Sequence, residues 1–276
     1  MTSRLRARVF GRESEPESGN PAIVVWNTAH RTEDAFTAEA RAADVPVVAF
    51  LLEGDPRAVR FFTPRAELSF CGHGALAVGA AEARRLDVGV VRLAARQQTF
   101  TVEYDGQEHA ALVLSEPGRT AVEPRPEEVL AALGVAPADL AAGAIHVGSA
   151  GSPKWLVELA SPEALARLAP DMAALEEVSR ARDVNGAYVF TRMGDTDGVH
   201  VLARGFNPRG GVAEDAATGV AAAALGRLMQ SGTARSRLVV DQGIELRNLN
   251  RIDVSVSGGQ IRVGGRVTFE PEERPS

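Results

Sequence analysis

The sequence predicts an α+β protein of two pseudosymmetric halves, each a curled, mostly antiparallel, barrel-like sheet around a central helix. Three observations lead to this prediction. Short segments rich in Val, Phe and Thr, bounded by Gly, Pro or charged turns, outnumber long helical ones. Residues 60–86 resemble residues 203–229. Both segments end in an Ala-rich stretch that is apolar on nearly every face, which is typical of a helix at the centre of a domain.

The strands are expected in two sets, one in each half. Residues 116–128 separate the sets, and their three prolines and several charges are interpreted as an interdomain connection. The N-terminal half is therefore expected to cover residues 1–118 and the C-terminal half residues 119–276, with the final residues able to pack back on the first half. A hairpin turn is expected at Gly258 and Gly259, because glycine permits positive φ. The expected strands are 5–10, 22–26, 47–52, 59–62, 90–93, 99–104, 110–114, 144–147, 155–159, 186–191, 199–206, 237–241, 252–257, 260–263 and 266–269.

The similar segments share more than composition. Each carries an aromatic-x-Pro, Phe62-Thr63-Pro64 or Phe206-Asn207-Pro208, followed by a polar loop and a glycine that opens the Ala-rich helix. Superposing Gly74 on Gly219 brings His73 opposite Thr218. The shared aromatic-x-Pro favours an internal duplication, although Ala- and Gly-rich helices also look alike by composition alone.

Charge and composition limit the partners and the compartment. The net charge is −6 and the basic residues are scattered, so nucleic acid and anionic membranes are not expected as partners. Cys71 is the only cysteine, which excludes an intrachain disulfide and suits a reducing compartment. The N-terminus has no apolar run behind its charges, and no stretch is long and apolar enough to span a bilayer. We therefore expect a cytoplasmic protein.

The two predicted helix starts have the properties of an anion site. Cys71-Gly72-His73-Gly74 and Thr218-Gly219-Val220 each place glycine where unpaired backbone N–H groups meet a partial positive charge. The sequence predicts that both loops meet in a cleft between the halves and hold a small carboxylate substrate. The alternative for either loop is that glycine only relieves crowding at the helix start.

These loops resemble the PhzF-like family, the phenazine-biosynthesis-like isomerases. The phrase FTPRAELSFCGHGALAVGAA is similar to that family's Phe-Thr-Pro, Glu-Leu and Cys-Gly-His signature, and FNPRGGVAEDAATGVAA to its Glu-Asp-x-x-Thr-Gly motif. Further matches are Gly19-Asn20-Pro21-Ala22 and Gln242-Gly243. The resemblance implies a diaminopimelate-epimerase-like fold and a cofactor-independent biosynthetic isomerase without a metal, and it implies a homodimer.

The sequence departs from the family at a position that matters for chemistry. The family carries Ser-Glu-Thr before the strand that precedes Phe-Thr-Pro, and its glutamate is the general acid/base. Pro46-Val47-Val48 stands there in this sequence, and Val47 cannot move a proton. The serine that usually follows Thr-Gly is Val220. The fold should tolerate both changes.

Other residues could supply the chemistry. His73 is a candidate proton shuttle, or else a histidine bonded to backbone at a helix start. Asp215 is a candidate general base, or else a carboxylate that stabilises a helix N-terminus. Cys71 is more typical of a small buried residue than of a thiolate. Glu67 and Glu214 could replace the missing glutamate. The expected site comprises the catalytic residues Asp215 and His73 and the substrate-binding residues Cys71, Gly72, Gly74, Thr218, Gly219, Val47 and Asn20.

The function expected from these residues is isomerisation of a small carboxylate-bearing metabolite by proton shuffling. Two alternatives remain. A cyclase or lyase could act on a less polar substrate accommodated beside Val47, or a ligand-binding pseudoenzyme could have kept the cleft after losing catalysis.

Overall fold

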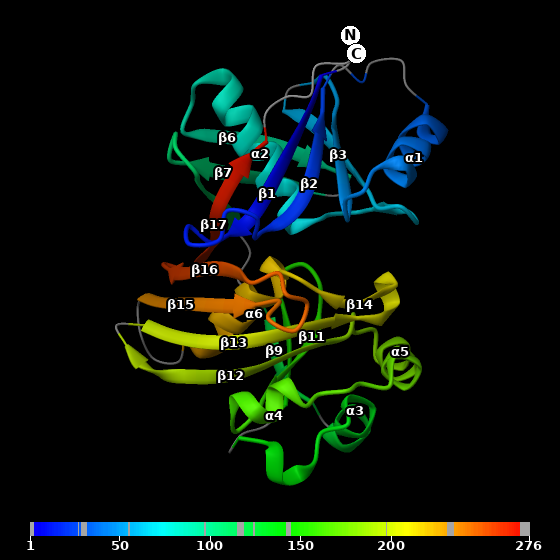
Figure 1. Cartoon of the computed structure of the whole chain (residues 1–276), viewed down its shortest axis with the longest axis vertical. Helices are drawn as coiled ribbons and strands as arrows, with labels where there is room; N and C mark the ends of the chain where they lie inside the picture. Colours follow the sequence, from blue (N-terminus) through cyan, green and yellow to red (C-terminus); the bar gives the residue numbers. More distant parts are fainter. Residues whose placement is uncertain are drawn as a thin grey trace. The chain divides into compact units, whose positions relative to one another are not determined.

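The chain folds into two compact units. The computed structural model describes residues 3–26, 28, 32–54, 56–96, 98–114, 119–123, 125–141, 145–196, 198–230 and 235–270. Unit 1 comprises Met1–Leu114 and Gly264–Ser276, and unit 2 comprises Ser115–Val263 (Figure 1). Each unit is a sheet curled around one helix, which confirms the predicted α+β fold.

Unit 1 is a closed barrel. Each barrel strand pairs with the next in the order β1, β2, β3, β4, β6, β7 and β8, and β17 closes the ring by pairing with both β8 and β1. The short strand β5 adds to β4. The strands are β1 (Arg4–Gly11), β2 (Asn20–Val25), β3 (Val47–Leu51), β4 (Arg57–Phe62), β5 (Glu67–Leu68), β6 (Val90–Ala95), β7 (Gln98–Tyr104), β8 (His109–Leu114) and the second part of β17 (Gln260–Phe269).

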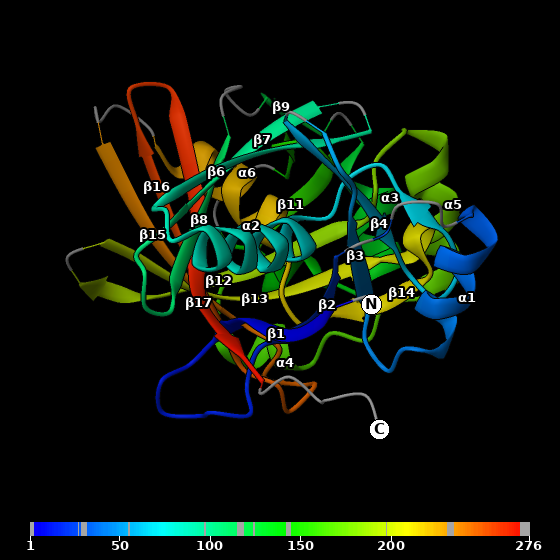
Figure 2. The ribbon, with the colours of Figure 1, turned by 90° about the horizontal axis from the view of Figure 1, so that it is seen from above.

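Helix α2 (Gly72–Leu86) fills this barrel and contacts β1, β2, β3, β6, β7 and β8 (Figure 2). Its small residues allow the sheet to approach closely. At Gly79, an added Cβ would lie 2.4 Å from a methyl group of Val102 on β7. The structure therefore confirms the expected central helix, and it explains why that helix is rich in Ala and Gly.

Helix α1 (Glu33–Ala42) covers the outside of β2 and β3. Phe36 of α1 packs with Val48 and Phe50 of β3 in one buried cluster. Because side chains alternate along a strand, the neighbouring residues Val47 and Ala49 face the interior of the barrel. This alternation determines which residues of β2 and β3 can lie beside α2.

Unit 2 repeats the arrangement around α6 (Gly219–Met229), which contacts β9, β10, β15 and β16. A second buried cluster joins the sheet to the outer helices α3, α4 and α5. The other elements are β9 (Arg119–Val122), α3 (Pro126–Leu133), a 3₁₀ turn (Pro137–Asp139), β10 (His146–Ser149), β11 (Lys154–Glu158), α4 (Pro162–Ala166), α5 (Met172–Ala181), β12 (Ala187–Thr196), β13 (Gly198–Asn207), a 3₁₀ turn (Pro208–Gly210), β14 (Val212–Asp215), β15 (Arg235–Gln242), β16 (Asn250–Ser257) and the first part of β17.

The connections show that the units are pseudosymmetric. In unit 1, β2 and β3 are parallel, β3 to β5 run antiparallel in succession, and β4 and β6 are parallel across α2. In unit 2, β11 and β12 are parallel, β12 to β14 are antiparallel in succession, and β13 and β15 are parallel across α6. The same order of pairings in both units supports the predicted duplication.

An arginine–glutamate clamp recurs in both units. In unit 1, the guanidinium of Arg60 donates to both carboxylate oxygens of Glu67, at 2.8 and 2.7 Å, and lies 5.0 Å from the ring centre of Phe62. In unit 2, Arg204 donates to Glu214 at 2.9 and 2.7 Å and lies 5.2 Å from the ring centre of Phe206. The phenylalanines are those of the two aromatic-x-Pro motifs. The clamp of unit 1 joins β5 to β4, and the clamp of unit 2 joins β14 to β13. In both units, the second of these strands carries the phenylalanine.

The structure differs from the expected elements in several places. Short strands β5, β9 and β14 were not expected, because two to four residues show no periodicity. Residues 116–128 are more than a connection, since they contain β9 and the start of α3. Residue 144 and residues 115–118, beside the expected domain boundary, lie outside the described residues. Within the described residues, no helix is long and apolar enough to cross a membrane.

Candidate functional site

Asp215, Thr218 and Gly219 lie together at the start of α6. Asp215 ends β14, Thr218 is the N-cap residue of α6 and Gly219 is its first residue. The hydroxyl of Thr218 donates to Oδ2 of Asp215 at 2.9 Å, and the backbone N–H of Ala217 donates to Oδ1 at 3.4 Å. The carboxylate is therefore held at a defined place beside the N-terminus of the helix, where a negative charge is favoured.

Gln242, a fully buried residue at the end of β15, fixes this loop. Its amide nitrogen donates to the backbone oxygen of Asp215 at 2.7 Å and to the hydroxyl of Thr218 at 3.1 Å. Its amide oxygen accepts from the backbone N–H of Thr218 at 3.1 Å and from the hydroxyl of Tyr188 at 2.9 Å. The sequence marked Gln242 only as a family-like residue, and the structure shows that it organises the loop.

Two buried ionisable residues near Asp215 were missed by the sequence analysis. Lys154 begins β11, is 2% exposed, and donates from Nζ to the backbone oxygen of Asn185 at 2.7 Å. Burial lowers the pKa of Lys154 to about 8, and the nearby carboxylate of Asp215 acts in the opposite direction. Burial raises the pKa of Tyr188 well above 10, and Asp215 adds to that shift. No motif surrounds either residue. Lys154 stands out in the sequence only as the single lysine, and the fold shows that it is buried.

A second group of expected site residues gathers at the start of α2 in unit 1. Cys71 is the N-cap residue of α2, and its Sγ lies 3.4 Å from Nδ1 of His73. Gly72, His73 and Gly74 form the first turn. The thiol and the imidazole are half-buried. Binding of a carboxylate at this turn stays a prediction from the sequence.

Val47 and Asn20 belong to the same end of the barrel. Val47 is fully buried, and its Cγ1 would lie 3.4 Å from a Cβ added to Gly74. Asn20 begins β2, is buried, and shares the inward face of that strand with Ala22, whose register partner is Val47. The wall beside the α2 loop is therefore apolar at Val47, the position where the sequence predicts that the family's glutamate is missing.

Glu67 and Glu214 do not lie free in these loops. Both carboxylates are bound by arginine in the clamps. The hydrogen bond from Arg60 lowers the pKa of Glu67, so that this residue stays ionised. We therefore assign neither glutamate an acid–base role.

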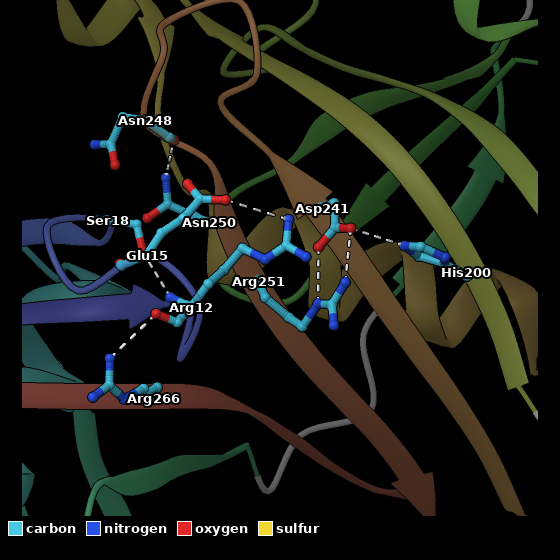
Figure 3. Close-up of polar contacts among 9 residues, drawn as sticks. All are labelled: Arg12, Glu15, Ser18, His200, Asp241, Asn248, Asn250, Arg251 and Arg266. Carbon is cyan, nitrogen blue, oxygen red and sulfur yellow. Dashed lines mark hydrogen bonds and ion pairs between the residues drawn. The ribbon is translucent and has the colours of Figure 1, made fainter.

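A further polar cluster lies on β13, β15 and β16 (Figure 3). Asp241, with a nearly buried side chain, accepts two hydrogen bonds of 2.9 Å from Arg251 and lies 3.1 Å from Nε2 of His200. Asp241 alternates with the inward-facing Val240 and Gln242 and so lies on the other face of the sheet from α6. Its charge is matched by arginine, which is typical of a structural ion pair.

Changing Val47 to Glu should preserve the fold. The carboxylate would lie beside the first turn of α2, whose N–H groups stabilise a negative charge, so we expect a loss below about 3 kcal/mol in unfolding free energy. Val48→Glu is the matched control, because Val48 faces the apolar cluster under α1, and it should cost about 3 kcal/mol or more. Denaturant titration measures both. Equal losses for the two variants would contradict the placement of Val47 at the site.

Comparisons with known proteins agree with the resemblance seen in the sequence. Residues 9–270 match the family described as phenazine biosynthesis-like protein, PhzC-PhzF. The chain is 30% identical over 260 residues to an uncharacterised isomerase of Pseudomonas aeruginosa, with 92% of each chain covered. It is 32% identical over 264 residues to the trans-2,3-dihydro-3-hydroxyanthranilate isomerase of the same species, covering 91% of this chain and 89% of that protein.

Solved structures share the fold. A phenazine biosynthesis protein of the PhzF family from Bacillus anthracis has a TM-score of 0.85 and 21% identity, with 99% of this chain and 98% of that chain covered. Two units, each a sheet curled around one helix, form the diaminopimelate-epimerase-like fold, which also occurs among amino-acid epimerases of known structure.

Proposed function

Since the chain belongs to the phenazine biosynthesis-like (PhzC-PhzF) family and is an isomerase-like enzyme, we propose that it moves a proton within a small carboxylate-bearing metabolite without a cofactor. The observation that carries this proposal is the carboxylate of Asp215. It is held beside the start of α6 by Thr218, at 2.9 Å, and its loop is fixed by Gln242. A carboxylate fixed in this way can take a proton from a carbon atom without first reorganising.

The other residues of the two helix starts have supporting roles in this proposal. The N–H groups at Gly219 bind the anionic end of the substrate beside Asp215. At the start of α2, Gly74 stays a predicted anion-binding residue and His73 a predicted proton shuttle, since an imidazole can give or take a proton near neutral pH. Cys71 lies beside the ring of His73 and orients it. Asn20 and Val47 contribute one polar and one apolar group to the wall near α2.

The buried side chain of Val47 favours a second candidate. An apolar wall accommodates a less polar substrate, as a cyclase or lyase recruited from this family would need. A protein that only binds its ligand is the third possibility, because the anion-binding helix starts do not depend on the missing glutamate.

Incubation of the protein with carboxylates in ²H₂O tests the proposal. The panel includes trans-2,3-dihydro-3-hydroxyanthranilate, the compound that names one relative. We expect the product to carry deuterium at a carbon atom and otherwise to have the same elemental composition as the substrate. Mass spectrometry and NMR measure both. A product that has lost or closed a bond would support the cyclase or lyase. Retention of a compound without exchange would support the binding protein and contradict the isomerase.

A further inference from the structure

Lys154 is the only lysine in the sequence, which contains 30 lysine and arginine residues in total. The other 29 of these residues are arginines. The two are not equivalent, because arginine keeps its proton at any ordinary pH whereas a buried lysine can release it. The single lysine is also 2% exposed, although a charged ammonium is costly to bury. A buried lysine differs from both alternatives, because it can carry a charge as arginine does and can also release its proton.

The fold places Lys154 at the end of unit 2 where α6 begins. The register of the strands places it there. Trp155, the next residue, pairs with Ala187 on β12, and Ala187 pairs with Phe206 on β13. Nζ donates to the backbone oxygens of Asn185, at 2.7 Å, and Phe206, at 3.4 Å. Asn185 precedes β12 and Phe206 lies near the end of β13. An added Cβ on Gly205, beside Phe206, would lie 2.7 Å from the hydroxyl of Thr218.

The side chain of Lys154 belongs to the face of β11 that points toward α6. Leu156, two residues along the strand, lies beside Ala224 of α6 near Gly148. Tyr188, the register partner of Leu156, donates to Gln242 of β15, which in turn bonds to Thr218 at the start of α6. Since strand residues alternate, Lys154 shares this face. Asp215 of β14 is the ionisable group that acts on the charge of Lys154, and it also acts on Tyr188 of β12.

We propose that Lys154 and Asp215 form an acid–base pair that takes the place of the glutamate absent at Val47. The inference rests on the proposed function and names a second catalytic residue for it. Asp215 removes a proton from a substrate carbon, and the electrons of that C–H bond delocalise into the substrate. The ammonium of Lys154 then gives a proton to another atom of the delocalised anion and becomes a neutral amine.

The pair is then reset. Exchange with solvent takes the proton from the carboxyl of Asp215 and returns one to the amine of Lys154, which restores a carboxylate and an ammonium. The substrate has been isomerised, and no proton is gained or lost overall. This cycle needs a lysine that can lose its proton near neutral pH, which agrees with the effect of burial on Lys154. Tyr188 stays protonated throughout, because burial raises its pKa.

The single lysine makes a direct test possible. Protein labelled with lysine carrying ¹³C at Cε gives one lysine side-chain signal, whose chemical shift is followed from pH 6 to pH 11. We expect one titration with a midpoint near pH 8. In Asp215→Asn the midpoint should fall, because the carboxylate that favours the ammonium is gone. A midpoint near 10.5, or one that Asp215→Asn leaves unchanged, overturns the pair.

Turnover gives the second readout. Lys154→Arg keeps a charge and hydrogen-bond donors but cannot release a proton, and it should lower turnover by about 100-fold or more. Lys154→Met should do the same. Circular dichroism checks that the variants fold. The ¹³C titration of the wild-type protein does not depend on any variant. An active Lys154→Arg enzyme overturns the catalytic role. If the wild-type protein turns over no carboxylate, the proposed function fails, while the ¹³C titration still decides whether the two residues are coupled.

Discussion

Changing Asp215 to Asn is expected to lower turnover by about 10²–10⁴-fold while the protein remains folded. Asparagine keeps the size of the side chain and one oxygen that can accept from the hydroxyl of Thr218. In the wild-type protein this hydroxyl lies 2.9 Å from the carboxylate. It cannot take a proton from carbon. A carboxylate that only stabilised the start of α6 would contribute about 0.5–2 kcal/mol to stability and nothing to the rate.

Measuring melting temperature and turnover together separates these roles. Asp183→Asn is a matched control in the same unit, since Asp183 has a side chain that is 94% exposed, and it should leave the rate unchanged. A lower melting temperature for Asp215→Asn with unchanged turnover would end the catalytic assignment of Asp215. His73 would then be the remaining candidate among the residues expected from the sequence.

Arg204→Met is expected to lower the unfolding free energy by about 3–5 kcal/mol. The side chain of Arg204 is 8% exposed and holds the carboxylate of Glu214 together with the backbone oxygens of Leu165 and Leu168. Burial opposes the charge of Arg204, but the hydrogen bonds and charge of Glu214 outweigh it and raise its pKa. Methionine would leave Glu214 as a nearly buried charge without this guanidinium, which is the costly outcome.

Two control variants make this test specific, with stability measured by denaturant titration. Arg209→Met removes a guanidinium bound to the exposed Asp183 and should cost about 1 kcal/mol or less. The double variant Arg204→Met, Glu214→Leu removes both charges of the clamp and should recover much of the loss. If Arg204→Met costs no more than Arg209→Met, the clamp does not stabilise unit 2.

Sequence patterns predicted most of the larger elements. The strands rich in Val and Phe and the two Ala-rich helices lie where expected, because burial on one strand face or all around a helix leaves a regular signature in the residues. The clamps left no such signature. Arg60 and Glu67 are seven residues apart, whereas Arg204 and Glu214 are ten apart, so a search at fixed spacing does not match them. Their equivalence appears only when the pairings of β4 in unit 1 are compared with those of β13 in unit 2.

By itself, the sequence determined the fold of two sheets that each curl around a helix, the duplication and the residues that open α2 and α6. Those features depend on neighbours along the chain, on alternation in strands and on small residues in helices. Only the tertiary structure decided what surrounds each helix start. It placed Lys154, Tyr188 and Gln242 near Asp215, and Val47 against Gly74. These residues lie 27 to 61 positions apart in the chain. Their chemistry depends on how deeply they are buried and on the distances between them. Strand pairing sets both, and the order of residues along the chain does not show them.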